Sequence, residues 1–189
     1  MKKNLVLNLI LCALFAALSA ALSQVSVPLG LVPVVMTHVA IFAGAGLLGW
    51  KWGTMSQVVY IAMGAVGLPV FAQSSGGPGV LMGPTGGFIV GYALAALGVG
   101  LLLDRFGRRW ALAPAMLLGV LLVYLPGIPW LMHTTGSGFV ESATLYMLPF
   151  LPGDLLKAAA SAVLIARLYP VAQRYLRYGQ SPVALPKST

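Results

Sequence analysis

Long runs of apolar residues alternate with short polar gaps along most of this chain. Each run approaches the roughly 20 residues that an α-helix needs to cross a bilayer. The pattern predicts about six helices, at residues 5–22, 32–48, 53–68, 86–103, 111–131 and 152–169. It therefore predicts an all-α, polytopic membrane protein in which residues 1–189 form a single transmembrane domain.

Composition agrees with this pattern. Of the 189 residues, 59% are hydrophobic and 7% are charged, which excludes a soluble domain of this length. The formal net charge of +8 would suggest a nucleic-acid partner in a soluble protein. Here the basic residues flank the apolar runs and are not interleaved with aromatic residues, so no nucleic acid is expected. The single cysteine, Cys12, allows no intramolecular disulfide.

The basic residues fall on one side of the predicted helices. If the N-terminus is cytoplasmic, the outer gaps at residues 23–31, 69–85 and 132–151 contain no Lys or Arg. The cytoplasmic side then holds Lys2, Lys3, Lys51, Arg105, Arg108, Arg109, Arg167, Arg174, Arg177 and Lys187. Because Lys and Arg concentrate in cytoplasmic loops, both termini are expected in the cytoplasm. Lys157 is the basic residue that topology does not explain.

The N-terminus has some features of a signal peptide, because Lys2 and Lys3 precede an apolar run that ends among small residues. The run at residues 5–22 is long for the apolar core of a signal peptide, and positive charge before it would equally orient a membrane helix. We therefore expect a retained first helix.

Asp154 and Lys157 lie one helical turn apart at the start of the last apolar run. An ionisable residue inside a membrane span costs about 2.5–3.5 kcal/mol on insertion scales, so it is usually kept for function. Asp154 could instead cap the helix, with Lys157 as its neutralising neighbour. Because the one-sided distribution of basic residues does not explain Lys157, a function for the pair is favoured.

Residues 67–91 are too rich in glycine and proline for a regular helix and too apolar for an ordinary solvated loop. Irregular backbone near membrane depth is tolerated where protein covers it or where it lines a cavity. We therefore expect this segment to fold back as a lid over a site on the outer side, although a plain glycine-rich turn is the alternative. Neutral hydrogen-bonding side chains would come from Gln73, Ser74, Ser75 and Thr85. Tyr92 could bond a ligand or simply pack.

Small residues at four-residue spacing, Ala13, Ala17 and Ala21, form a stripe on the first helix. Such stripes mark close helix contacts in lipid, either within the chain or with a partner. His38, near the outer end of the second run, is expected to be a hydrogen-bonded packing residue. No P-loop sequence occurs, and no cluster of His and Asp has metal-ligand spacing, so neither a cofactor nor a metal is expected.

Asp154, Lys157 and the segment around Gln73 would together form a pocket with an acceptor, a cation and neutral polar groups. Lys157 would pair with a ligand carboxylate, and Asp154 would accept hydrogen bonds from ligand N–H groups. The expected ligand is a small amphipathic anion that carries both a carboxylate and N–H donors.

Residues 67–72, 75–88 and 148–157 resemble motifs of the biotin-specific substrate-binding component (BioY) of energy-coupling factor (ECF) transporters. The resemblance extends over nearly the whole chain. It implies a six-helix fold in the bacterial cell membrane, a biotin site near the outer face closed by loops, and import powered by separate ATPase and transmembrane coupling subunits.

The resemblance also assigns roles to residues. The acid and the lysine of the family match Asp154 and Lys157, and Gln73 would be the amide that contacts the ureido group of biotin. The small residues Ala13, Ala17 and Ala21 would face the coupling subunit.

Two other functions remain open. One is an intramembrane enzyme with Ser74 or Ser75 as nucleophile and His38 or His133 as base. No G-x-S-x-G sequence surrounds either serine, which argues against it. The other is a stand-alone permease for a small anion, which usually has repeated halves and more charged residues in its spans.

Overall fold

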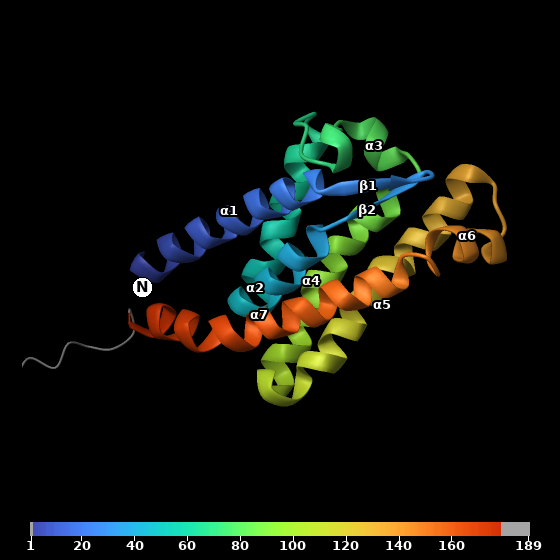
Figure 1. Cartoon of the computed structure of the whole chain (residues 1–189). Coiled ribbons are helices and arrows are strands. Elements are labelled where there is room, and N and C mark those ends of the chain that lie inside the picture. Colours follow the sequence, from blue (N-terminus) through green and yellow to red (C-terminus); the bar gives the residue numbers. More distant parts are fainter. Residues whose placement is uncertain (1, 179–189) are drawn as a thin grey trace, which may run out of the picture.

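The computed structural model describes residues 2–178, and most of them are helical (Figure 1). The long helices are α1 (Lys2–Gln24), α2 (Thr37–Ala65), α4 (Gly86–Phe106), α5 (Arg108–Thr135) and α7 (Leu151–Tyr178). The shorter elements are strands β1 (Ser26–Leu29) and β2 (Val32–Val35), the 3₁₀ helix η1 (Ala72–Ser74), and helices α3 (Pro78–Met82) and α6 (Phe139–Tyr146). Lys187, counted above with the basic residues, lies outside the described residues.

Within the described part of the chain, four helical segments are long and apolar enough to cross a membrane. They are Leu5–Gln24, Gly86–Phe106, Trp110–Thr135 and Leu151–Ala172. Large apolar side chains such as Leu14 and Leu121 lie exposed on them. Exposed leucines on this scale suit a surface that faces lipid rather than water. The prediction of a polytopic, mainly helical membrane protein is thereby confirmed.

Helix α2 contains most of the two helices predicted at residues 32–48 and 53–68, and it is interrupted at Gly49. Gly49 has φ 80° and ψ 177°, a conformation that only glycine adopts readily. Ala45 and Gly53 would lie about 12 Å apart along a straight helix. A Cβ atom at Gly53 would instead lie 2.6 Å from the Cα of Ala45, so the chain folds back at Gly49 and the two halves pack closely.

A β-hairpin replaces the predicted start of the second helix. Strands β1 and β2 pair antiparallel, from Ser26 opposite Val35 to Leu29 opposite Val32, and Gly30 in the turn has φ 69°. Helix α2 therefore begins at Thr37 and not at residue 32. The prediction was wrong because an apolar run alone does not distinguish a strand from a buried helix, and here β-branched valines favour the strand.

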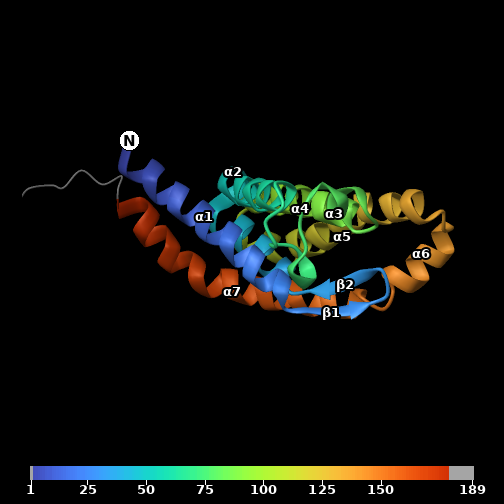
Figure 2. The ribbon, with the colours of Figure 1, turned by 90° about the horizontal axis from the view of Figure 1, so that it is seen from above.

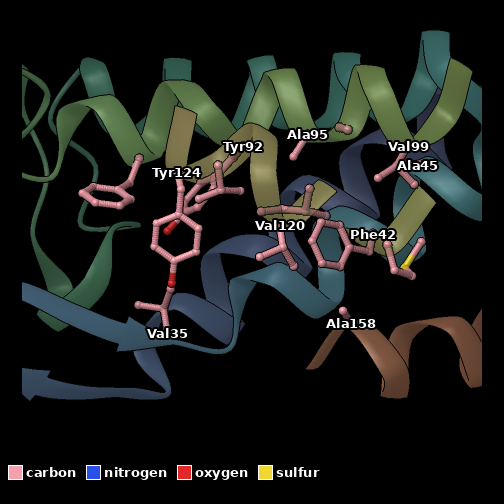
Figure 3. Close-up of a cluster of buried hydrophobic side chains, with 14 of the residues drawn as sticks. Val35, Phe42, Ala45, Tyr92, Ala95, Val99, Val120, Tyr124 and Ala158 are labelled. Carbon is pink, nitrogen blue, oxygen red and sulfur yellow. The ribbon is translucent and has the colours of Figure 1, made fainter. Parts of the chain in front are cut away.

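Helices α2, α4 and α5 form the centre of the fold. Helix α4 packs on α2 and α5, while α1 packs on α2, and α7 packs on α2 and α5 (Figure 2). Between them lies a core of mostly small or β-branched side chains around Phe42, including Ala45, Ala95 and Val99 (Figure 3). Small side chains allow the close approach of helices that lipid-embedded packing requires.

The two ends of the molecule differ. The β-hairpin, η1, α3 and α6 gather toward one end, here called the hairpin end (Figure 1). The N-terminal part of α1, the turn at Gly49 and the junction of α4 with α5 lie toward the other. There the Oδ2 atom of Asp104 accepts a hydrogen bond from the backbone N–H of Trp50 at 3.1 Å and thereby satisfies a free donor at the start of the second half of α2.

Candidate functional site

A cavity of about 180 Å³ lies at the hairpin end. Its wall is built from nearly every element there: the hairpin, the first residue of α2, the second half of α2, the segment around η1, α3 and the start of α4. The lining residues that carry polar side chains are Ser23, Thr37, Tyr60, Gln73, Ser75, Thr85 and Tyr92. The others are apolar or glycine and include Phe71 and Phe88. Such a wall suits an amphipathic ligand.

Two polar positions on this wall differ in how their groups are satisfied. The hydroxyl of Ser75 donates to the carbonyl of Ala72 at 2.7 Å. The side chain of Thr37 is fully buried, yet its Oγ1 atom makes no hydrogen bond in the described part of the chain. Because a buried, unpaired hydroxyl is costly, Thr37 offers a hydrogen-bonding group to a ligand.

A smaller chamber of about 30 Å³ adjoins this cavity. The two share Val35 and Tyr92 among their lining residues, and the smaller one adds Asp154, His38 and Tyr124. Figure 3 shows Val35, Tyr92 and Tyr124 gathered where β2 approaches the long helices. A few side chains, among them Val35 and Tyr92, thus separate the larger cavity from the carboxylate of Asp154.

Asp154 and Lys157 are both buried, with 4% and 6% of their surface exposed. Their spacing on α7 places them on one face, and the Nζ atom of Lys157 donates to Oδ1 of Asp154 at 2.6 Å. Lys157 also donates to the carbonyl of Val35 at 2.9 Å, and the Tyr124 hydroxyl donates to Oδ2 of Asp154 at 2.5 Å. The carboxylate thus bonds side chains rather than backbone N–H groups of α7, so the interpretation of Asp154 as a helix cap is wrong.

His38 lies beside this pair. Its Nδ1 atom is 3.7 Å from Oδ1 of Asp154, and its ring packs against the rings of Phe42 and Tyr92. Neither ring nitrogen makes a hydrogen bond among the described residues. His38 is therefore a packing residue, as expected, but the expected hydrogen bond is absent.

The polar residues predicted for the site lie in four places, of which the exposed position of Ser74 is described separately below. Gln73, Ser75, Thr85 and Tyr92 line the larger cavity. Asp154 lines only the smaller chamber, and Lys157 lies behind it, in neither lining.

Ser74 is not part of the cavity wall. It is exposed, and both its backbone N–H and its hydroxyl bond the Oε1 atom of Gln24, at 2.9 and 3.1 Å. Ser75 bonds Ala72, and His133 is exposed at the end of α5. Neither serine thus has a histidine as its hydrogen-bond partner in the described structure, which gives no support to a nucleophile and base pair.

The stripe of small residues on α1 faces outward. Ala13, Ala17 and Ala21 are exposed, whereas Ala16, on the other side of the helix, is 1% exposed and packs into the core. Packing within the chain therefore uses a different face of α1 from the predicted stripe.

Sequence reasoning missed several residues of the site. Tyr60 and Tyr124 were missed, although a tyrosine within an apolar run signals a hydroxyl that needs a partner. Thr37 was missed because its burial depends on the hairpin. Among the described residues, no group of three His, Cys, Asp or Glu side chains could hold a metal ion.

Comparison with known proteins connects this geometry to a family. The model of the BioY family matches residues 1–174. The chain belongs to the BioY family. The probable biotin transporter BioY of Methanothermobacter thermautotrophicus is 40% identical over 66% of this chain and 85% of its own length. The biotin transporter BioY of Thermotoga maritima is 35% identical over 77% of this chain and 86% of its own length. The probable biotin transporter BioY of Lysinibacillus sphaericus is 36% identical over 90% of this chain and 91% of its own length.

A solved structure is similar to this BioY chain throughout the fold. The crystal structure of the S-component for biotin from an ECF-type ABC transporter matches with a TM-score of 0.81 and 28% sequence identity. The match covers 89% of this chain and 93% of that chain. The arrangement of helices around the cavity is therefore the S-component fold.

Proposed function

We propose that this protein captures biotin at the outer face of the membrane and serves as the S component of an ECF transporter for its uptake. The observation that carries the proposal is the cavity at the hairpin end, whose wall includes residues of the segments that resemble BioY motifs, in a chain that the BioY family model matches over residues 1–174. As a member of this family the chain is a transporter subunit and not an enzyme.

The chemistry of the cavity suits biotin. Its apolar walls, which include Phe71 and Phe88, would hold the fused rings and the alkyl chain, and neutral polar groups of Gln73, Ser75, Thr85 and Tyr92 would bond the ureido group or the carboxylate. Thr37 adds a free hydroxyl.

The resemblance to BioY implies that Asp154 and Lys157 contact the ligand. Their bonds within the chain show what must change for that contact to form. Lys157 already donates to Asp154 and to the carbonyl of Val35. A ligand group that reaches the pair must pass Val35 and Tyr92, which line both the cavity and the chamber. We infer that binding rearranges this boundary and that a charge-assisted hydrogen bond to the ligand replaces the bond to Val35.

We also propose a topology of six spans with both termini in the cytoplasm of the cell. The fold-back at Gly49 lets the two halves of α2 act as two crossings in addition to the four apolar helices. Lys51 and Arg105 lie near that turn, at the end away from the hairpin, which supports a cytoplasmic position for it. The cavity would then open to the outside.

The coupling partner would dock on α1. Ala13, Ala17 and Ala21 are exposed on a helix that crosses the membrane, and a stripe of small residues lets another helix approach closely. We propose that this stripe contacts the transmembrane coupling subunit, which in turn is served by the ATPase subunits.

The first test is biotin binding by the purified protein, with any co-purified ligand identified by mass spectrometry. Lys157→Ala should weaken binding by about 2–5 kcal/mol because the site loses a desolvated cation. Lys51→Ala, the same change at an exposed lysine near the Gly49 turn, should leave the affinity unchanged. Equal affinity in both variants would remove Lys157 from the site, and no binding by folded, ligand-free wild-type protein would refute the function.

The second test separates binding from uptake. Ala17→Trp should leave biotin affinity unchanged and reduce uptake by cells that contain the coupling and ATPase subunits, because the larger ring blocks close helix approach. Ala113→Trp, at an exposed alanine of α5, is the matched control and should transport normally. Full uptake by the Ala17 variant would contradict the docking face. Uptake by wild-type protein in cells without those subunits would favour a stand-alone permease.

A further inference from the structure

The last two residues of α1 hold the segment that follows α2 by its backbone. The Oγ atom of Ser23 lies 2.5 Å from the carbonyl oxygen of Val70 and 2.7 Å from that of Ala20 in its own helix, and its one proton can be donated to either. The Nε2 atom of Gln24 lies 3.5 Å from the carbonyl of Pro69 and 3.1 Å from that of Phe71 and donates to both. Three consecutive carbonyl groups therefore lie within hydrogen-bond distance of two adjacent side chains of α1.

The same glutamine also holds the next turn of the segment. Its Oε1 atom accepts hydrogen bonds from the backbone N–H and the hydroxyl of Ser74. Gln73 and Ser74 have φ of 59° and 55°, so two consecutive residues with side chains occupy the left-handed region. Such backbone persists only where neighbouring contacts determine it, and Gln24 supplies contacts on both sides of the turn.

The segment that is held in this way forms one part of the cavity wall. Phe71, Gln73 and Ser75 line it, and the Phe71 ring packs edge-on against Tyr60 with ring centroids 5.5 Å apart. Gln73 lines the cavity and is exposed, so the wall there is a single layer of chain between the cavity and the surroundings. Gln24 does not line the cavity and can act only through this segment.

We propose that Ser23 and Gln24 form a latch that keeps the segment of residues 69–75 closed over the cavity. Opening of this single-layer wall is the step by which ligand leaves, and it requires these bonds to break. Because the latch is part of α1, which also carries the exposed alanine stripe, a displacement of α1 by a docked partner would pull directly on the cavity wall. Gln24 is thus a positioning residue for ligand retention, and this inference rests on the proposed binding of biotin.

The first experiment measures the dissociation of labelled biotin from purified protein after addition of excess unlabelled biotin. Gln24→Ala should dissociate about tenfold faster, because affinity differences of this kind reside mainly in the dissociation rate. Thr144→Ala is the control, since the Thr144 hydroxyl donates to the carbonyl of Val140 within α6. Equal dissociation rates for Gln24→Ala and wild type would overturn the latch.

A second experiment locks the latch instead of removing it. In a Q24C/S74C variant, a short bis(methanethiosulfonate) cross-linker joins the two positions, because each cysteine thiolate displaces methanesulfinate and forms a reducible disulfide; the native Cys12 is buried. Cross-linking after biotin has bound should slow dissociation at least tenfold, and reduction should restore the original rate; the uncross-linked variant is the control. Unchanged dissociation in fully cross-linked protein would show that ligand leaves by another route.

These outcomes are separable from failure of the proposed function. If folded, ligand-free wild-type protein binds no biotin, the proposed function is refuted and the latch with it. If the wild type binds biotin and neither variant changes its dissociation, only the latch is refuted.

Discussion

The charged pair Asp154–Lys157 and the cavity wall in front of it differ in whether their buried polar groups have hydrogen-bond partners. In the cluster, Lys157 bonds Asp154 and the Val35 carbonyl, and Tyr124 bonds the other carboxylate oxygen. In the cavity wall, Thr37 is just as buried and its hydroxyl has no partner in the described structure. The charged groups are thus satisfied without a ligand, whereas the cavity retains at least one group that only a ligand or water can satisfy.

This difference separates stability from binding. Removing one member of a paired cluster leaves another buried charge or polar group without its partner, so the folded state is destabilised even before ligand is added. Removing an unpaired hydroxyl takes away a desolvation penalty in the free protein and a hydrogen bond in the complex. Substitutions in the two regions should therefore change stability and affinity in different proportions.

The largest effect is expected at Asp154. Asp154→Ala leaves the Lys157 ammonium buried with only the Val35 carbonyl, and breaking a buried pair in this way costs about 3–5 kcal/mol of unfolding free energy. The double variant D154A/K157A should recover part of that loss, because no unpaired charge remains. Unfolding of the wild type, the two single variants and the double variant in the same detergent measures the loss and its recovery. A double variant less stable than either single variant would contradict the paired cluster.

A smaller loss is expected at Tyr124. Tyr124→Phe removes the hydrogen bond to Asp154 and keeps the ring against Phe88, so the unfolding free energy should fall by about 1.5–3 kcal/mol. Tyr146→Phe is the matched control, since no side-chain hydrogen bond of Tyr146 is present among the described residues. If both substitutions lower the unfolding temperature equally, the bond to Asp154 contributes nothing specific.

The smallest effect is expected at Thr37, where a substitution should lower the affinity for biotin rather than the stability. Thr37→Val keeps the shape of the side chain and removes the unpaired hydroxyl, so stability of the ligand-free protein should be unchanged or slightly raised. Biotin affinity should fall by about 1 kcal/mol if the hydroxyl bonds the ligand. Calorimetric titration measures the affinity for biotin, and thermal unfolding measures the stability of the ligand-free protein. A loss of stability with unchanged affinity would contradict the role of the Thr37 hydroxyl in binding.

The hydrophobic pattern located most ends of the long helices to within a few residues. It ended the last helix at residue 169, whereas α7 continues through Pro170 to Tyr178. The break between the second and third apolar runs was placed correctly, because the apolar run is interrupted there and Gly49 permits the turn. The strand Val32–Val35 was assigned to a helix, since its pairing with residues 26–29 is a tertiary event that the local run does not encode.

The candidate site was predicted in its parts but not in its arrangement. The sequence pointed to Gln73, Ser75, Thr85 and Tyr92, and all four line one cavity. It could not show that Ser74, between two of them in the chain, turns away to bond Gln24, because that depends on two residues with positive φ.

The sequence by itself determined a polytopic helical membrane protein with an ionisable pair in its last span. Apolar length and the cost of charge in lipid act on local segments, so they can be read directly from the order of residues. Only the tertiary structure decided that the pair is bonded to Tyr124 and Val35, and that α1 holds the cavity wall through Gln24. Those contacts join residues 30 to 122 positions apart, and burial and hydrogen-bond satisfaction are set by which elements pack together, not by neighbours in the chain.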